Sequence, residues 1–202
     1  MRFRLLVLSF VLLLPTLSFA QNFGVMESAE TIDRGNFKLR VNPMLFFGND
    51  VPDDQQGVAF MAGYGFTDKF DVEGGAALYD GVHLFGGNAE FWVMKRKPFD
   101  LSIIPGLHVT RGDRALDSTG FDLTVLASKH MTPRLDLYGG LDFAFESVTD
   151  DRVSDANYKT VHLVPGIEYK VHRDVDLLAE IGIGLNKAAA NYFSAGVAFY
   201  LR

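Results

Sequence analysis

Four residues in the second half of the chain could carry general acid–base chemistry. They are His108, Asp142, Glu146 and His162. A carboxylate that orients a histidine within hydrogen-bond reach makes the histidine a base that could activate water. The four residues are distant in sequence, so only a fold that brings their segments together would assemble such a site. The pairing of Glu146 with His162 predicts, as an alternative function, a hydrolase or a lipid-modifying enzyme.

Other chemistry has weaker support in the sequence. Ser128 and His130 lie two residues apart, and His83, His108 and His162 show no spacing that is diagnostic of metal ligation. The chain has no Cys, which excludes disulfides and thiolate chemistry. Histidines beside carboxylates are also expected in any polar interior. We therefore expect no enzyme, no metal and no cofactor.

The first twenty residues have the layout of a secretory signal peptide. Arg2 and Arg4 precede an apolar run from Leu5 to Leu14, and Ser18-Phe19-Ala20 forms a small-x-small cleavage site. The run is too short for a transmembrane helix. Loss of the two arginines changes the formal charge from −6 to −8 (−6 minus 2). This acidic balance argues against nucleic-acid binding, because phosphate contacts need clustered Lys and Arg.

After Gln21 the dominant pattern is an alternation of apolar and polar residues. Alternation with a period of two predicts strands that have one apolar and one polar face. Most candidate strands are roughly as long as the 9–11 tilted residues that cross a bilayer. The candidate strands lie near 36–47, 57–66, 69–79, 83–94, 98–110, 119–130, 134–147, 158–170, 174–185 and 191–201.

These strands predict an all-β fold, a single closed antiparallel up-and-down transmembrane barrel of ten strands, with eight strands as the alternative. Short polar turns such as Thr67-Asp68 alternate with mostly longer loops such as Gly48–Gln56, and an even strand count places both termini at the short-turn side. Glycines such as Gly75, Gly106 and Gly182 fall on the polar face, where a narrow interior has little room. We therefore expect the apolar face to point outward, toward lipid, with aromatic belts at both strand ends.

Three features resemble the small outer-membrane β-barrel proteins of Gram-negative bacteria. They are the signal peptide, the closing strand, and a tight turn with the strand that it opens, Tyr64-Gly65-Phe66-Thr67-Asp68-Lys69-Phe70-Asp71-Val72. The resemblance covers nearly all of the mature chain. It implies a location in the outer membrane, outer-membrane lipids as surroundings and insertion by the barrel-assembly machinery. These families usually end in an aromatic residue, whereas here Arg202 follows Phe199-Tyr200-Leu201.

Three parts are therefore expected along the chain. Residues 1–20 form the signal peptide, residues 21–34 a periplasmic N-terminal segment, and residues 35–202 the barrel domain. The sequence leaves open whether the N-terminal segment hangs in the periplasm or folds into the mouth of the barrel. It gives no oligomeric state.

Charged residues on the polar face predict a network inside the barrel, toward its short-turn end. Such residues either pair with one another in a filled barrel or form a constriction that prefers cations. The expected members are Lys38, Arg40, Asp71, Glu73, Glu90, Asp100, Asp136, Lys170, Asp176, Glu180 and Arg202.

The function predicted from these features is a porin-like outer-membrane barrel that is either structural or a narrow passive pore for small solutes or ions. An enzyme with a site near the extracellular end of the interior is the alternative. The substrate and ion preference do not follow from the sequence.

Overall fold

The structure is a computed structural model, and it describes residues 23–48, 55–79, 81–96, 98–112, 117–149 and 157–202. The predicted signal peptide and the cleavage site lie outside these residues. The described part of the chain contains no helix with the length and apolar character needed to cross a membrane.

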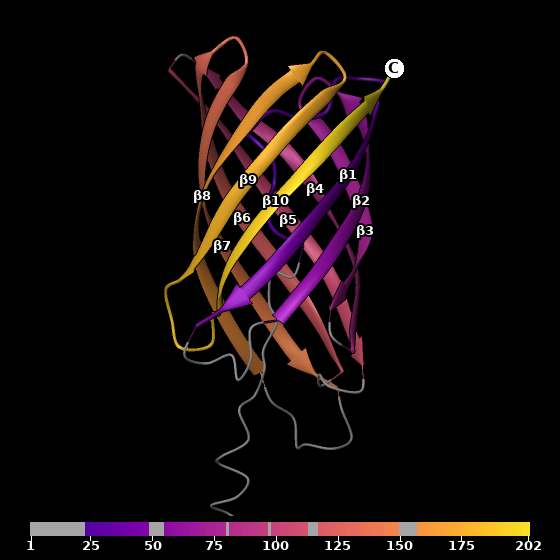
Figure 1. Cartoon of the computed structure of the whole chain (residues 1–202), viewed down its shortest axis with the longest axis vertical. Coiled ribbons are helices and arrows are strands. Elements are labelled where there is room, and N and C mark those ends of the chain that lie inside the picture. Colours follow the sequence, from indigo (N-terminus) through magenta and orange to yellow (C-terminus); the bar gives the residue numbers. More distant parts are fainter. Residues whose placement is uncertain (1–22, 49–54, 80, 97, 113–116, 150–156) are drawn as a thin grey trace, which may run out of the picture.

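Ten antiparallel strands close into one barrel, in which every strand pairs with its neighbour in the chain and the last strand pairs with the first. Figure 1 shows the tilt of the strands and the C-terminus at the short-turn end, at the top of the view. The prediction of ten strands is confirmed, and the alternative of eight is wrong. The strands are β1 (Phe37–Phe47), β2 (Gln55–Thr67), β3 (Phe70–Tyr79), β4 (Val82–Arg96), β5 (Phe99–Gly112), β6 (Ser118–Thr132), β7 (Leu135–Val148), β8 (Asn157–His172), β9 (Val175–Gly184) and β10 (Asn191–Leu201).

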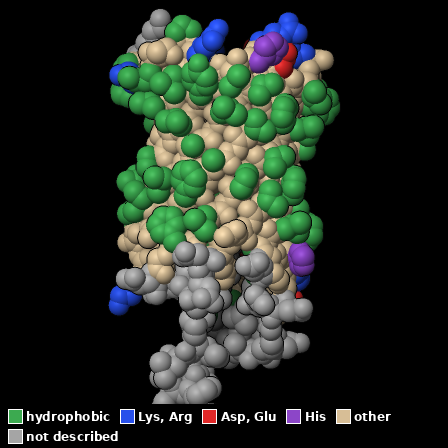
Figure 2. Space-filling model, viewed as in Figure 1, with side chains coloured by type: hydrophobic (Ala, Val, Ile, Leu, Met, Phe, Trp, Pro, Cys, Tyr) green, Lys and Arg blue, Asp and Glu red, His purple; other side chains and the backbone are tan. Residues whose placement is uncertain are grey.

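The apolar face of the strands points outward, as the alternation predicts. Val72, Leu137 and Ile181 expose 39%, 40% and 45% of their surface, although each lies within a long strand. Figure 2 shows hydrophobic side chains over the barrel wall and charged side chains at its two ends. A wall of this kind needs hydrocarbon around it, and the closed barrel pairs the backbone groups that lipid cannot satisfy.

An arginine in the middle of this wall is expected to destabilise the barrel strongly. Leu163, at the middle of β8, exposes 41% of its surface, and Val171, near the short-turn end of the same strand, exposes 48%. In lipid vesicles, Leu163→Arg should lower the free energy of unfolding by about 2–4 kcal/mol, whereas Val171→Arg should cost about 0–1 kcal/mol. Urea titration of both variants measures the difference. Equal costs would contradict the assignment of this face to lipid.

Residues 23–32 lie inside the barrel, and Asp33 and Arg34 continue to its exposed rim; we call residues 23–34 the plug. Val25, Met26, Ala29 and Ile32 are all at most 5% exposed. Of the two positions that the sequence leaves open for the N-terminal segment, these residues take the one within the barrel. The reason is that carboxylates on the inner wall accept hydrogen bonds from backbone amides of the plug. These amides therefore keep a hydrogen-bond partner when they leave water.

The chain passes from the plug into β1 over the end of β2. Gly35 has a φ of +83°, which glycine adopts without steric cost. The Gly35 amide donates to the Gly65 carbonyl at 2.8 Å, and the Gly65 amide donates to the Asn36 carbonyl at 3.1 Å. A Cβ at Gly65 would lie 2.3 Å from the carbonyl oxygens of Ile32 and Asp33. Glycine at this position thus allows the close approach that turns the chain into the barrel.

Candidate functional site

The interior of the barrel holds a buried cluster of charges that joins the plug to β1 and β3. Lys38 Nζ lies 3.1 Å from Glu27 Oε2 and 2.8 Å from Glu73 Oε1. Arg40 Nη2 lies 3.4 Å from Glu73 Oε2, and its Nη1 lies 3.9 Å from Glu27 Oε2. All four side chains are at most 6% exposed. Because each charge faces an opposite one, the cluster is stable only when plug and wall are together.

Glu180 of β9 is the second anchor of the plug. Its carboxylate accepts the backbone amides of Val25 at 2.9 Å and Met26 at 2.6 Å. It also accepts the hydroxyls of Tyr138 at 2.9 Å and Tyr192 at 3.0 Å. Four donors thus fix the position of this buried carboxylate, and two of them belong to the first residues of the plug.

Further contacts follow the plug along its length. Arg40 donates to the carbonyls of Val25 at 2.8 Å and Met26 at 2.7 Å, so it binds both the plug backbone and Glu73. Other wall residues form hydrogen bonds with further backbone groups of the plug. These contacts are Asn42 Nδ2 to the Phe23 carbonyl at 3.0 Å, the Ser28 amide to Glu168 at 3.1 Å and the Ile32 amide to Asp71 at 2.6 Å.

The carboxyl of Glu27 is expected to make plug docking depend on pH. Burial raises the pKa of Glu27 from 4.5 to about 7, and Lys38 opposes this rise. In water the pKa would return to its ordinary value, so between about pH 4.5 and pH 7 the docked plug binds more protons than the undocked plug. Docking should therefore weaken as pH rises through this window and level off above it. Planar-bilayer opening frequency at pH 5 and pH 7.5 measures this, and Glu27→Gln should reduce the difference; an unchanged difference would contradict it.

The long-loop half of the interior is apolar on one side, which the alternation of the strands does not predict. The ring centroid of Phe46 lies 5.4 Å from that of Tyr79 and 5.8 Å from that of Tyr192. Buried small and aliphatic side chains extend this surface. They are Met44, Ala59, Ala77, Val82, Leu84 and Ile104, and they form one cluster with Val25 and Ala29 of the plug. The interior is thus charged toward the short-turn end. Toward the long loops it is apolar on this one side, while buried polar residues such as His108, Asp142 and Glu146 occupy the other side.

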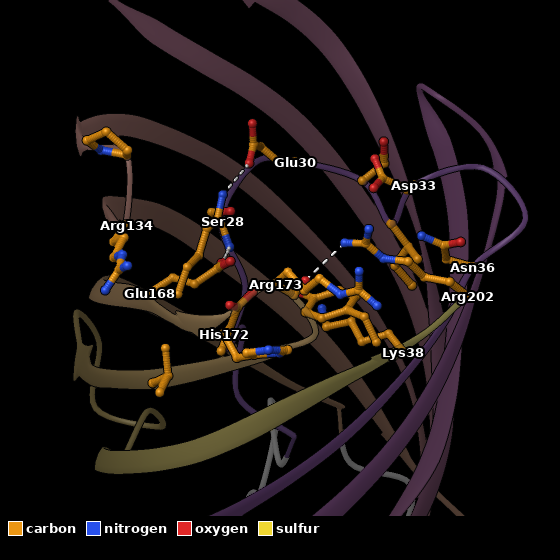
Figure 3. A pocket seen from close by; sticks show the side chains of 17 residues that line it. Ser28, Glu30, Asp33, Asn36, Lys38, Arg134, Glu168, His172, Arg173 and Arg202 are labelled. Atoms are coloured by element: carbon orange, nitrogen blue, oxygen red, sulfur yellow. Dashed lines mark hydrogen bonds and ion pairs between the residues drawn. The ribbon is translucent and has the colours of Figure 1, made fainter.

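The cavities of the interior match this division. A cavity of about 40 Å³ lies beside Phe23 and Glu27, which is room for a few waters at most. A second cavity of about 560 Å³ opens at the short-turn mouth, and its lining includes Glu30 and Asp33 of the plug with Lys170 and Tyr200 of the wall. Figure 3 shows Glu30 and Asp33 on one side of this cavity and His172 and Arg173 on the other. The lining of this larger cavity is polar and charged.

The predicted pairing of Glu146 with His162 does not form. The register places Glu146 opposite Tyr158 and His162 opposite Asp142. His162 Nε2 donates instead to the Ala190 carbonyl at 2.9 Å. Glu146 contacts Nε2 of His108, two strands away, across the space left by Gly120.

His108 is held on both sides. Its Nδ1 lies 2.6 Å from Asp122 Oδ2, and its Nε2 contacts Glu146. With a carboxylate at each ring nitrogen, neither nitrogen is free to take a proton from a water or a substrate. The geometry of these residues is that of a buried ion-pair network, which gives the enzyme alternative no support. Asp142 accepts the Thr124 hydroxyl at 2.6 Å.

Ser128 and His130 do not pair either. His130 Nδ1 lies 2.5 Å from Asp136 Oδ1, and its Nε2 lies 3.1 Å from Glu30 Oε1 and 3.4 Å from Asp100 Oδ2. Within the described residues the Ser128 hydroxyl has no hydrogen-bond partner.

The structure brings most of the predicted charge network together. Lys38, Arg40 and Glu73 form the cluster with the plug, and Lys170 Nζ lies 3.2 Å from Asp136 Oδ2 at the short-turn mouth. Arg202 differs from these, because it lies beyond β10 at the rim of the short-turn mouth, where it lines the larger cavity and its Nε lies 3.1 Å from Asp174 Oδ1. The remaining members, all buried on the inner face, are Asp71, Glu90, Asp100, Asp176 and Glu180.

Three partners of the network were not predicted. Glu27 and Glu30 belong to the plug, whose sequence has no alternation that would place it inside a barrel, and Glu168 continues the inward face of β8. Glu168 could have been found by extending the alternation of its strand. Glu27 and Glu30 carried no such signal.

Comparisons with known proteins agree with this architecture. The NanC porin has a TM-score of 0.51 and 9% sequence identity, with 81% of this chain and 100% of that chain covered. An outer membrane channel from Pseudomonas putida F1 has a TM-score of 0.51 and 9% identity, with 86% of this chain and 98% of that chain covered. At this identity the likeness shows the fold, that of an outer-membrane β-barrel. No curated protein matches the chain.

The family comparison rests on the sequence itself and covers more than half of the chain. Residues 92–202, from the second half of β4 to the end of the chain, match the model of a family described as the putative MetA-pathway of phenol degradation. The matched range includes β5 to β10, and so it contains Glu180, His108 and His130, whereas the plug contacts of β1 and β3 lie before it. This outer-membrane β-barrel chain belongs to the family of the putative MetA-pathway of phenol degradation.

Proposed function

We propose that the protein is a non-enzymatic outer-membrane channel for small, weakly polar aromatic compounds, closed by its plug in the state described above. The observation that carries this proposal is the apolar side of the long-loop half of the interior, where Phe46, Tyr79 and Tyr192 form an aromatic surface that ends on the plug. Aromatic surfaces of this kind bind flat apolar molecules, with the hydroxyls of the tyrosines as polar partners.

The family gives the proposal its substrate class. A protein that serves phenol degradation in an outer membrane would admit phenol-like compounds from outside and release them into the periplasm. The apolar surface at the long-loop end and the polar cavity at the short-turn mouth suit that direction of passage. Export through a signal peptide and insertion by the barrel-assembly machinery belong to the same proposal.

Uptake of 1-naphthol by cells tests this function. Cells that make the full chain should accumulate 1-naphthol faster than cells with an empty vector, whereas arabinose uptake should stay the same. Equal rates of 1-naphthol uptake in the two strains would remove the proposal. Faster arabinose uptake would favour a hydrophilic pore instead.

A matched pair of variants locates the route. Phe46 is 3% exposed and faces inward, and Phe85 is 55% exposed on the outer wall. Phe46→Asn should slow 1-naphthol uptake and Phe85→Asn should not, at equal amounts of folded barrel. Folded barrel is measured by heat-modifiable migration on a gel.

The second candidate is a purely structural barrel. It is favoured by the extent to which the plug fills the described interior, with a cavity of only about 40 Å³ beside Phe23. The two candidates differ in one result, because a structural barrel would give no uptake of either compound above the empty vector.

A further inference from the structure

We propose that the short-turn mouth binds one divalent transition-metal ion, with Zn²⁺ as the model, and that this ion clamps the plug to the barrel wall. The ligands are His130 Nε2, a carboxylate oxygen of Glu30 and a carboxylate oxygen of Asp100. Glu30 belongs to the plug, whereas Asp100 and His130 belong to the adjacent strands β5 and β6. The ion would therefore join two parts of the chain that otherwise meet through hydrogen bonds and ion pairs.

The spacing of the ligand atoms fits a metal ion. His130 Nε2 lies 3.1 Å from Glu30 Oε1 and 3.4 Å from Asp100 Oδ2. Bonds of about 2.0–2.2 Å at tetrahedral angles place neighbouring ligand atoms roughly 3.3 Å apart. His130 Nε2 thus lies at ligand spacing from each of the two carboxylates, and the Glu30 and Asp100 side chains would turn toward one another around the ion. Water would complete the coordination at the open side of the mouth.

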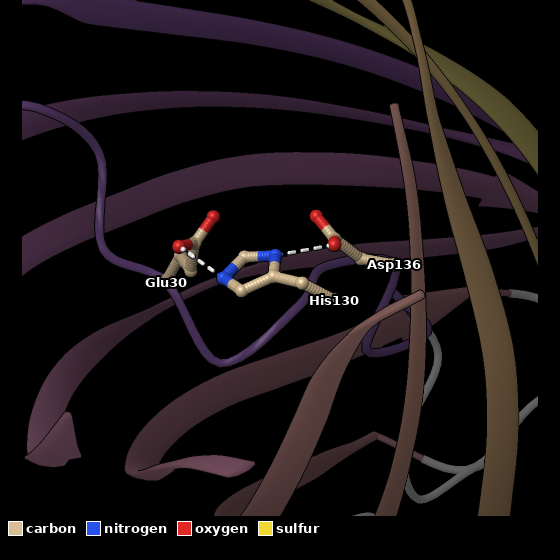
Figure 4. Close-up of side chains that lie close together, drawn as sticks. All are labelled: Glu30, His130 and Asp136. Atoms are coloured by element: carbon tan, nitrogen blue, oxygen red, sulfur yellow. Dashed lines mark hydrogen bonds and ion pairs between the residues drawn. The ribbon is translucent and has the colours of Figure 1, made fainter. Parts of the chain in front are cut away.

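Asp136 orients the histidine for this role. Its Oδ1 lies 2.5 Å from His130 Nδ1, the ring nitrogen opposite the ligand atom (Figure 4). A carboxylate that accepts the Nδ1 proton fixes the ring and raises the basicity of Nε2, as in the second shell of many zinc sites. On metal binding, the Nε2 lone pair bonds to the ion and any proton on Nε2 leaves to solvent.

The charge of the mouth is balanced by a divalent ion. Three carboxylates, those of Glu30, Asp100 and Asp136, surround His130. Lys170 supplies one positive charge, with its Nζ 3.3 Å from Glu30 Oε2 and 3.2 Å from Asp136 Oδ2. Lys170 uses the carboxylate oxygens that face away from His130, so it braces the ligands without blocking them. With a neutral histidine the net charge of this group is −2, which one divalent cation neutralises.

The ligand types select the class of metal. Imidazole nitrogen suits Zn²⁺, Ni²⁺ and Cu²⁺, whereas Mg²⁺ and Ca²⁺ prefer oxygen ligands alone. His130 has 50% of its side chain exposed and Glu30 has 27%, so an ion from the periplasmic side has access. Because the site is complete only when the plug is docked, metal binding stabilises the docked state.

Calorimetric titration of the tag-free, chelator-treated full chain in detergent tests the proposal. We expect one saturable Zn²⁺ site per chain and an upward shift of the heat-modifiable transition with Zn²⁺ that Mg²⁺ does not produce. His130→Ala should remove both effects. Asp136→Asn should weaken Zn²⁺ binding by roughly tenfold to 100-fold, as loss of an orienting group does elsewhere.

Two further variants make the result decisive. Glu30→Gln alters only the plug, and it should weaken Zn²⁺ binding. It therefore tests the site independently of His130→Ala, which changes the barrel wall and could prevent folding. His172→Ala is the control, because His172 lies at the same mouth with 65% of its side chain exposed, and it should leave the affinity unchanged. Absence of a saturable site in the full chain, or unchanged binding in both His130→Ala and Glu30→Gln, would overturn the proposal. Unchanged binding in Glu30→Gln alone would show that the ion does not clamp the plug.

Discussion

Glu180→Ala is expected to undock the plug and open the barrel. The substitution removes the acceptor of the Val25 and Met26 amides and leaves the hydroxyls of Tyr138 and Tyr192 without their carboxylate. Each buried donor that loses its partner costs about 1–3 kcal/mol. Two such amides on the plug are enough to lower the docking equilibrium by more than about tenfold, since roughly 1.4 kcal/mol corresponds to a factor of ten.

The opening frequency of single barrels in planar bilayers measures this effect. Glu146→Ala is the matched control, because Glu146 is also a buried glutamate of the inner wall but contacts His108 rather than the plug. Glu180→Ala should open at least tenfold more often than the full chain, and Glu146→Ala should not. Equal opening of the two variants would show that Glu180 does not hold the plug.

Arg40→Met is expected to give the largest loss of stability among single substitutions in the interior. Arg40 is 1% exposed, binds Glu73 and donates to two plug carbonyls. Its removal leaves the carboxylates of Glu27 and Glu73 with Lys38 alone. Breaking a buried ion pair on one side costs about 3–5 kcal/mol, because the partner charge stays buried without compensation.

Urea unfolding in lipid vesicles measures the loss, and Arg202→Met is the control. Half of the Arg202 side chain is exposed, and its partner Asp174 lies at the same exposed turn. An exposed pair of this kind contributes at most about 1 kcal/mol. Arg40→Met should therefore shift the urea midpoint far more than Arg202→Met. Similar midpoints for the two variants would contradict the cluster described for Lys38, Arg40, Glu27 and Glu73.

The barrel could be predicted from the sequence because its signal is local. Alternation along each strand decides which side chains face lipid, and Val72, Leu137 and Ile181 follow that rule in the structure. The strand count also follows from the turns between alternating runs. Each of these inferences uses residues that are neighbours in the chain, so one sequence is enough to make them.

The plug could not be predicted because its partners are distant. Val25 bonds to Glu180, which lies 155 residues away, and nothing in residues 23–34 repeats with the period of a strand. A backbone that binds carboxylates through its amides carries no side-chain signature. The sequence therefore leaves two positions open for this segment, in the periplasm or in the mouth of the barrel.

Errors in the candidate site came from register and from strand ends. Glu146 and His162 lie on neighbouring strands, but the pairing places Tyr158 opposite Glu146, four residues from His162. The contact that does form, from Glu146 to His108, needs the missing side chain of Gly120 on the strand between them. Arg202 follows Leu201, where the strand ends, so it pairs with Asp174 at the rim of the mouth and not with the buried charges.

The central claim is that residues 23–34 close the interior of an outer-membrane barrel. Planar-bilayer conductance of the full chain and of a variant that lacks residues 23–34 tests it most directly. The full chain should be silent for most of the recording, and the shortened chain should show unitary current steps at equal amounts of folded barrel. Identical recordings, whether silent or conducting, would contradict the claim.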